Sequence, residues 1–198
     1  MEVVSISDTH LGSLEGQSGR VREFIETEVQ EISPDKFIVA GDMFDLWVGN
    51  PRELISESAG IVNAVMSLDS DIVLIGGNHD WALVNQLNDV LPFEVYAEHT
   101  FQSGNRDFRV MHGHQFDLLS KHIRNTRLST KNTTVMGELY QAQMHYGVGA
   151  LSKGIRRLQN SSFHDKLSRV ERRARKYSDE YLVFGHTHTP AINDDFVN

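Results

Sequence analysis

Short apolar runs alternate with longer amphipathic stretches along most of this 198-residue chain, and this alternation limits the folds it can adopt. The apolar runs are brief, rich in Val, Ile and Phe and followed by turn residues, which is typical of buried strands. They span residues 3–7, 36–40, 71–75, 108–111 and 180–184. Residues 18–32 and 52–68 place their apolar side chains at helical spacing. Strands alternating with helices indicate βαβ units, so we predict an α/β fold with at least partly parallel strands.

Two stretches depart from the alternation. Residues 98–111 contain two β-like runs around Gly104-Asn105, which predicts a hairpin. Residues 116–176 have helical spacing and contain no proline, so we predict two or three helices inserted between strands. A further strand is expected over residues 191–197. Because the chain length suits one compact domain, we predict a single domain over residues 1–198 with a helical cap at about 116–177.

Composition excludes several classes of protein. The chain has no cysteine, which rules out disulfides, thiolate zinc sites, iron–sulfur clusters and cysteine nucleophiles. Its apolar runs are all shorter than the roughly 18–20 residues that span a bilayer. The first twelve residues carry Glu2 and Asp8 and no basic region, unlike a secretory signal. We therefore expect a soluble, cytoplasmic protein.

Charge is distributed unevenly. The formal net charge is −8, yet residues 115–177 contain thirteen Lys and Arg and only four Asp and Glu. A basic segment in an acidic chain indicates an anionic partner for that segment.

Polar side chains that can bind metals follow almost every predicted strand. In open α/β sheets, ligands bind at the carboxyl ends of strands, so these clusters should converge in space. The five clusters are Asp8-Thr9-His10, Gly41-Asp42-Met43-Phe44-Asp45, Gly76-Gly77-Asn78-His79-Asp80, His112-Gly113-His114 and Gly185-His186-Thr187-His188. Taken singly, each has an ordinary explanation as a capped helix start, a solvent-facing strand end or a turn. Five of them at successive strand ends favour one shared metal site.

The candidate ligands are oxygen and imidazole donors, which suit Mn²⁺, Fe, Zn²⁺ or Mg²⁺ rather than Cu(I). There are more of them than one ion with a bound water can use, whereas two ions bridged by a carboxylate would use them all. Two ions about 3.5–4 Å apart can clamp a phosphoryl group and activate a hydroxide for in-line attack. The candidates are Asp8, His10, Asp42, Asn78, His112, His186 and His188.

This ordered set of motifs, from Asp8 to His188, resembles that of the calcineurin-like metallophosphoesterases. The resemblance implies a four-layer α/β/β/α sandwich with a dinuclear site at one edge, built here with the inserted helical cap. It also implies which of the candidate ligands bind each ion. The first ion would be held by Asp8, His10, Asp42 and His188, and the second by Asp42 as a bridge with Asn78, His112 and His186.

The resemblance also implies roles for residues that do not bind metal. His79 would lie beside the substrate phosphate, stabilise the transition state and protonate the leaving oxygen. Asp80 would orient His79, and Asp45 would be a carboxylate outside the ligand set. His114 would either orient or contact the substrate, or pack.

The predicted activity is metal-dependent hydrolysis of a phosphodiester, phosphomonoester or pyrophosphate bond. Mn²⁺ is the expected ion, with Fe, Zn²⁺, Mg²⁺, Co²⁺ and Ni²⁺ as alternatives. Residues 41–47 and the insert after Gly113 look most similar to the UDP-2,3-diacylglucosamine pyrophosphatase branch, in which helices form a lid over an acyl chain and a nucleotide. Members of that branch commonly carry Arg where this chain has His79, and often Asp where it has His114.

Two other functions compete with this one. The basic insert could grip phosphates in a nuclease that acts on DNA or RNA. Alternatively, the fold could serve as an inactive binding scaffold, which the intact ligand set argues against. The expected partner is therefore a phosphorylated small molecule, a nucleotide- or lipid-linked substrate, or a nucleic acid, and a homo-oligomer is a further expectation.

Overall fold

The structure, a computed structural model, describes residues 1–13, 17–47, 50–85, 91–116, 170 and 172–198. Its first sheet has four parallel strands in the order β1-β2-β3-β4. The strands are β1 (Val3–Ile6), β2 (Lys36–Ala40), β3 (Asp71–Ile75) and β4 (Val95–Tyr96). The parallel α/β arrangement predicted from the sequence is thus confirmed. The two-residue β4 has no counterpart among the predicted strands.

The second sheet is mixed, with the order β5-β6-β7-β8. Its strands are β5 (Glu98–Ser103), β6 (Arg106–Met111), β7 (Tyr181–Val183) and β8 (Phe196–Val197). β5 and β6 form the predicted antiparallel hairpin, and Gly104 in its turn has a φ of 60°, in the left-handed region that glycine tolerates best. β6, β7 and β8 are parallel. The strand expected over residues 191–197 is reduced to β8, with one antiparallel bridge between Ile192 and Val197.

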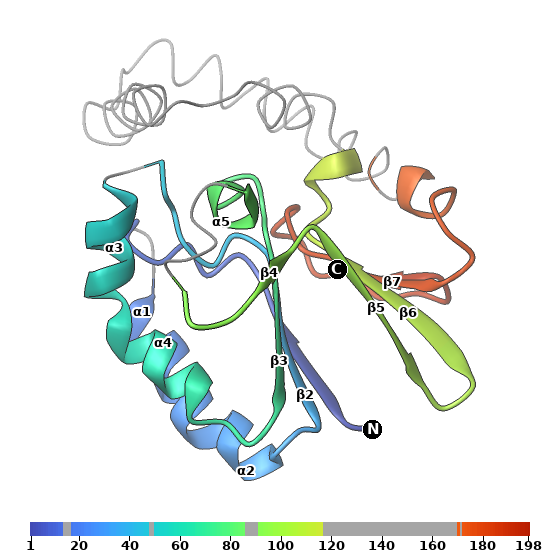
Figure 1. Ribbon diagram of the computed structural model, residues 1–198. Helices are drawn as coiled ribbons and strands as arrows, with labels where there is room; N and C mark the ends of the chain where they lie inside the picture. The colour runs from blue at the N-terminus through green and yellow to red at the C-terminus, as the bar shows by residue number, and fades with distance from the viewer. Residues whose placement is uncertain (14–16, 48–49, 86–90, 117–169, 171) are drawn as a thin grey trace, which may run out of the picture.

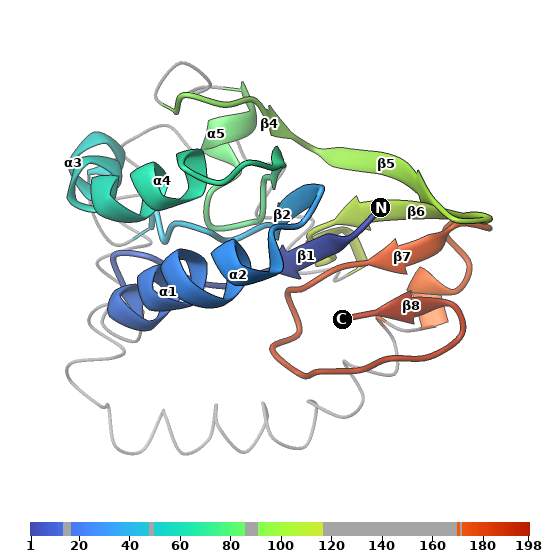
Figure 2. The same ribbon diagram turned by 90° about the horizontal axis from the view of Figure 1, so that it is seen from below.

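Helices cover one face of the first sheet, and the second sheet lies on its other side (Figures 1 and 2). The helix predicted over residues 18–32 consists of α1 (Ser18–Phe24), a π-helical turn η1 (Ile25–Val29) and α2 (Gln30–Ile32). The helix predicted over residues 52–68 is divided into α3 (Pro51–Glu57) and α4 (Ala59–Met66). The division falls at Ser58, whose ψ of 6° departs from the helical value. Two further short helical elements are α5 (Ala82–Asn85) and the 3₁₀ turn η2 (His114–Phe116).

Strand β2 is buried along its whole length because both faces of the first sheet are covered. Its Phe37 and Val39 belong to the core shared with the helices. Ile38 and Ala40, which point to the opposite face, belong to a core shared with Val110 of the second sheet. This packing sets the two sheets against each other and brings their strand ends to one region.

The far side of the second sheet carries a third apolar cluster, in which Val170 and Ala174 pack with Met111, Leu182 and Phe196. The chain therefore has an α/β fold with two sheets and helices over the first sheet. Most of the predicted helical cap, residues 117–169 and 171, lies outside the described residues. Within the described part of the chain, no helix has both the length and the apolar character required to cross a membrane.

Candidate metal centre

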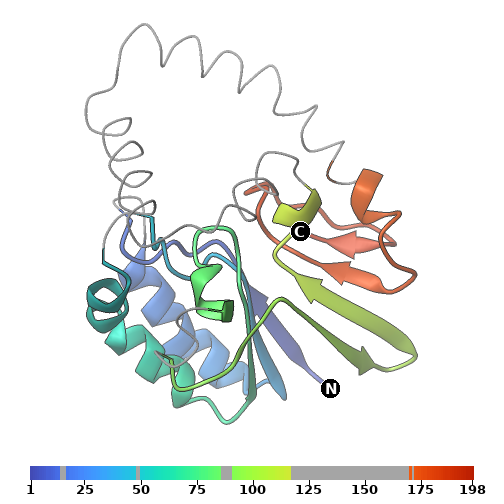
Figure 3. The same cartoon turned by 45° about the horizontal axis from the view of Figure 1, so that its top comes forward.

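The five polar clusters follow β1, β2, β3, β6 and β7 at one end of the two sheets. This end is at the top of Figure 1 and comes forward in Figure 3. Backbone hydrogen bonds tie the loops together, since the N–H of Asp8 donates to the carbonyl of Gly41 and the N–H of Gly185 to that of His112, both at 3.0 Å. The carboxylate of Asp8 also accepts the backbone N–H of His186, at 3.0 Å and 3.1 Å to its two oxygens. The predicted convergence of the clusters is confirmed.

Asp8, His10 and His188 form the more exposed group of candidate ligands. One donor atom from each lies within 4.8 Å of the other two. Nε2 of His188 is 3.4 Å from Oδ1 of Asp8 and 3.4 Å from Nε2 of His10. The side chain of His188 is 58% exposed, so this group opens to solvent.

Asp42, His112 and His186 form a second, more deeply buried group with the same spacing of donor atoms, in which Asp42 and His112 are buried and His186 is half-buried. Nε2 of His112 is 3.1 Å from Oδ2 of Asp42 and 3.1 Å from Oδ1 of Asn78. The other ring nitrogen, Nδ1, lies 3.0 Å from the carbonyl oxygen of Ala40, to which it can donate. That hydrogen bond fixes the ring and leaves Nε2 available to a metal ion.

Asp42 lies between the two groups. Its Oδ2 is 3.1 Å from Nε2 of His112 on one side and 4.0 Å from Nε2 of His10 on the other. This placement fits a carboxylate that bridges two ions. All seven predicted ligands are brought together, and their oxygen and imidazole donors fit a pair of divalent cations. That they bind metal stays a prediction.

Backbone strain is concentrated at these residues. Among the described residues, six other than glycine have positive φ, and five of the six are predicted ligands. Such conformations cost free energy and persist only where the surrounding structure enforces them, which is typical of functional sites. The five are Asp8 (55°), His10 (45°), Asp42 (52°), His186 (72°) and His188 (53°).

Two glycines allow the carboxylates to lie against neighbouring backbone. A Cβ atom at Gly77 would be 2.1 Å from Oδ1 of Asp42, and one at Gly185 would be 2.3 Å from Oδ2 of Asp8. Any side chain at either position would displace a predicted ligand.

The buried pair of Asp42 and His112 has strongly shifted pKa values. Burial alone would raise the pKa of Asp42, but the nearby His112 imidazolium lowers it well below its ordinary value. Burial likewise opposes a charge on His112, but the Asp42 carboxylate prevails and raises the pKa of His112 to about 9. In the protein without metal the two residues therefore form an ion pair, and a cation would replace the proton on His112.

His79 is held by several contacts. Its backbone N–H donates to Oδ1 of Asp42 at 2.8 Å, and its Nδ1 lies 2.9 Å from Oδ1 of Asp45. Burial would lower the pKa of His79, but the hydrogen bond to Asp45 and the charge of Asp42 raise it overall. One His79 ring nitrogen also lies within 4.8 Å of donor atoms of His10 and Asp42.

The predicted role of Asp80 requires a correction, because the carboxylate that contacts the His79 ring is that of Asp45. Asp80 is fully buried and accepts the backbone N–H groups of Gly77 at 2.6 Å and Phe44 at 3.2 Å. Burial, and then the charge of Asp42, raise the pKa of Asp80 to about 7. Asp80 thus links the loop after β3, which contains Gly77, to the loop after β2, which contains Phe44.

His114 is fully buried and lies beside His112 of the ligand cluster. Its ring centre is 5.4 Å from that of Trp81 and 5.4 Å from that of His112. These are packing contacts, and contact of His114 with a substrate stays a prediction.

A sequence model of the calcineurin-like phosphoesterases matches residues 1–190. The chain belongs to this family. Calcineurin-like phosphoesterases are metal-dependent hydrolases, so the predicted family and enzyme class are confirmed.

The enzyme is also similar over its full length to curated proteins. A UDP-2,3-diacylglucosamine hydrolase of Serratia proteamaculans is 21% identical, and the alignment covers 98% of this chain and 85% of the relative. A protein of the same description from Shewanella sp. is 26% identical, with 98% and 84% covered. A solved dimetal phosphatase from Danio rerio has a TM-score of 0.47 at 12% identity, covering 97% of this chain and 70% of that one.

The structure adds one residue to the centre that sequence reasoning did not assign to it. The indole of Trp47 stacks on the imidazole of His79, with ring centroids 3.8 Å apart and planes inclined by 22°. Trp47 comes two residues after Asp45 in the loop after β2, so its position in the motif was the available signal. Sequence reasoning missed Trp47 because an aromatic side chain at that position is more readily explained by core packing than by contact with a residue of the site.

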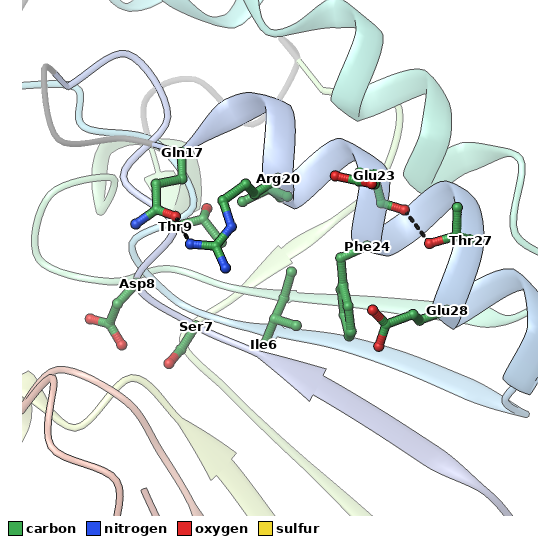
Figure 4. A pocket seen from close by; sticks show the side chains of 11 residues that line it. Ile6, Ser7, Asp8, Thr9, Gln17, Arg20, Glu23, Phe24, Thr27 and Glu28 are labelled. Atoms are coloured by element: carbon green, nitrogen blue, oxygen red, sulfur yellow. Dashed lines mark hydrogen bonds between the residues drawn. The ribbon is translucent and has the colours of Figure 1, made fainter.

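A cavity of about 650 Å³ lies beside the phosphoesterase centre, between the end of β1 and helix α1 (Figure 4). Asp8 borders both the cavity and the metal-ligand cluster. Arg20, whose Nη1 donates to Oε1 of Gln17 at 2.6 Å, is the basic residue of the lining. Glu23 and Glu28 also line it, so its charge does not favour a phosphate. The ligand cluster at the strand ends remains the better phosphate-binding candidate, because cations bound there would offset its carboxylates and attract the phosphate.

Proposed function

We propose that the chain hydrolyses a pyrophosphate or phosphodiester bond with two divalent ions, and that its substrate is a nucleotide-linked lipid of the UDP-2,3-diacylglucosamine type. The observation that carries the reaction is the position of Asp42 Oδ2 between His112 and His10. The substrate class is supported by the full-length similarity to UDP-2,3-diacylglucosamine hydrolases.

Seven residues would hold the two ions. Asp8, His10 and His188 would bind the more exposed ion, Asn78, His112 and His186 the buried one, and Asp42 both. Two bound ions would polarise the phosphoryl group and lower the pKa of the water that attacks it. Mn²⁺ is the ion we propose, as one of the divalent ions that oxygen and imidazole donors without sulfur suit.

His79 would supply the proton for the leaving oxygen. The hydrogen bond from Nδ1 to Asp45 orients the ring and favours its charged form, which leaves Nε2 to face the substrate. A positive imidazolium beside the phosphate would also stabilise the charge that develops in the transition state.

A substrate panel with Mn²⁺ tests the proposal. It comprises bis-p-nitrophenyl phosphate, p-nitrophenyl phosphate, UDP-linked sugars and their acylated forms, and single- and double-stranded DNA. We expect the highest kcat/KM for an acylated UDP-sugar, with hydrolysis abolished by EDTA and restored by Mn²⁺. Activity that survives both EDTA and Asp42→Asn would contradict the two-metal reaction. Asp107→Asn, an exposed carboxylate on β6, is the matched control and should retain full activity.

The nuclease alternative rests on the basic composition of residues 115–177. In a nuclease, several phosphates would be neutralised at once, so the affinity for DNA should fall steeply with salt concentration. For a nucleotide-linked lipid the dependence should be shallow. If the chain preferentially cleaves DNA, with a steep dependence on salt concentration, the substrate is a nucleic acid and the nucleotide-linked lipid is excluded. The proposed metal chemistry would be unchanged.

A further inference from the structure

The ring of His79 contacts three other side chains in the described part of the chain. Nδ1 is 2.9 Å from Oδ1 of Asp45, and the imidazole of His10 meets the ring edge-to-face at a centroid distance of 4.7 Å and an angle of 82°. The third contact is the parallel stack on Trp47, at 3.8 Å and 22°. It is the shortest of the ring–ring contacts around the centre.

These contacts constrain the ring in different ways. The hydrogen bond to Asp45 fixes the position of Nδ1, but one hydrogen bond leaves the ring free to pivot about that contact. The edge-to-face contact with His10 allows a range of tilts. A flat indole stacked on the imidazole face restricts the tilt of the ring plane, and therefore the direction of Nε2.

We propose that Trp47 is a positioning residue that fixes the plane of the His79 imidazole and thereby aims Nε2 at the leaving oxygen. The proposal rests on the proposed function, in which His79 is the general acid. As the bond from phosphorus to the leaving oxygen breaks, the proton on Nε2 passes to that oxygen, and an oxygen from water takes its place on phosphorus. The proton that the water loses passes to solvent, from which the imidazole is reprotonated.

Tryptophan suits this task for two reasons. Its face is large and rigid, and it attracts a charged imidazolium as well as a neutral imidazole. Trp47 is also carried by the loop after β2 that bears Asp42 and Asp45, so the stack and the hydrogen bond move with the same segment. A phenylalanine would keep part of the stacking surface, whereas a leucine would fill space without providing a flat face.

Leaving-group dependence tests the proposal, because proton donation matters most when the leaving oxygen is strongly basic. We compare Trp47→Leu and Trp47→Phe on methyl p-nitrophenyl phosphate and on methyl phenyl phosphate, whose leaving group is the more basic. For Trp47→Leu we expect kcat on the phenyl ester to fall about tenfold or more, a fraction of the roughly 10²–10⁴-fold that general acid catalysis supplies. In the same variant, kcat on the nitrophenyl ester should fall much less, and KM and metal content should be unchanged. Trp47→Phe should recover most of the kcat that Trp47→Leu loses on the phenyl ester.

A double-mutant cycle separates this proposal from the proposed function. If Trp47 acts through His79, adding Trp47→Leu to His79→Ala should cause no further loss of kcat. A further loss of the same size, or equal effects on both esters, would overturn the positioning role. If instead His79→Ala has no effect on either ester, the general acid of the proposed function has failed.

Fluorescence provides a readout that is independent of activity. The chain has two tryptophans, so Trp81→Phe leaves Trp47 as the one tryptophan whose emission is followed. Because a stacked imidazole quenches indole emission, His79→Ala in that background should brighten Trp47. Unchanged emission would show that the two rings do not stack in solution and would overturn the proposal.

Discussion

Nε2 of His112 lies 3.1 Å from Oδ2 of Asp42, and both side chains are almost completely buried. Burial opposes the charge on His112, but the carboxylate overcomes it and raises the pKa of the imidazole to about 9. The ordinary value is 6.5, so in the metal-free protein the imidazole is charged at neutral pH. The proton of His112 therefore occupies the position that a metal ion requires.

Metal binding at the buried group should release this proton. Between pH 7 and 9 we expect the affinity of that group for Mn²⁺ to rise by up to about tenfold per pH unit, and to level off above the pKa of His112.

The stability of the metal-free protein should also depend on pH, because the pKa of His112 is higher in the folded state than in the unfolded state. The contribution of His112 to stability is thus complete below about pH 6.5 and lost as the pH rises through about 9.

Calorimetric titration with Mn²⁺ in buffers of different ionisation enthalpy measures the protons released. His112→Gln should remove the release and one equivalent of metal, whereas His99→Gln, on β5 of the second sheet, should keep both. Binding that is independent of pH from 7 to 9 would contradict the ion pair.

The strands and the convergence of their end clusters could be predicted because they depend on local pattern and parallel topology. The apolar run at residues 36–40 is strand β2, and Asp42 follows it as expected. Which carboxylate contacts His79 could not be predicted in the same way. Asp80 is next to His79 in sequence, but the loop turns its carboxylate toward the amides of Gly77 and Phe44. Asp45 reaches the ring because strand pairing sets its loop beside the β3 loop, a tertiary relationship that the sequence does not display.

Asp45 and Asp80 should therefore respond differently to substitution by asparagine. Asp45→Asn removes the carboxylate that orients His79, so kcat should fall about 10- to 100-fold while the melting temperature changes little. Asp80→Asn replaces an acceptor of two buried amides by a group with a single acceptor oxygen, and should cost about 1–3 kcal/mol of unfolding free energy. Kinetics and denaturant unfolding of the two variants check this. If Asp80→Asn lost activity at unchanged stability, the original assignment of Asp80 to His79 would be restored.

His79 is close enough to His10 and Asp42 that its own role needs a test. If it acts on the substrate and does not bind metal, His79→Ala should retain both ions and lose roughly 10²–10⁴-fold in kcat. Elemental analysis measures the metal, and hydrolysis of methyl phenyl phosphate, whose leaving oxygen is strongly basic, measures the rate. Loss of one equivalent of metal would make His79 a ligand.

Gly77 gives a test of the centre that changes no ligand. A Cβ atom at this position would be 2.1 Å from Oδ1 of Asp42 and 2.4 Å from its backbone nitrogen, so Gly77→Ala must push Asp42 away. Because Asp42 lies between the two groups of ligands, the displacement should reduce metal binding at both groups. It should also cost about 1–3 kcal/mol of unfolding free energy, as overpacking does.

Gly19→Ala, in helix α1, is the matched control because nothing lies within 4 Å of its Cβ. It should leave metal content unchanged and stabilise the protein slightly, since alanine favours a helix over glycine. Metal analysis and thermal unfolding of both variants measure these effects. Two full equivalents of metal in Gly77→Ala would mean that Asp42 need not lie against the β3 loop to bind the ions.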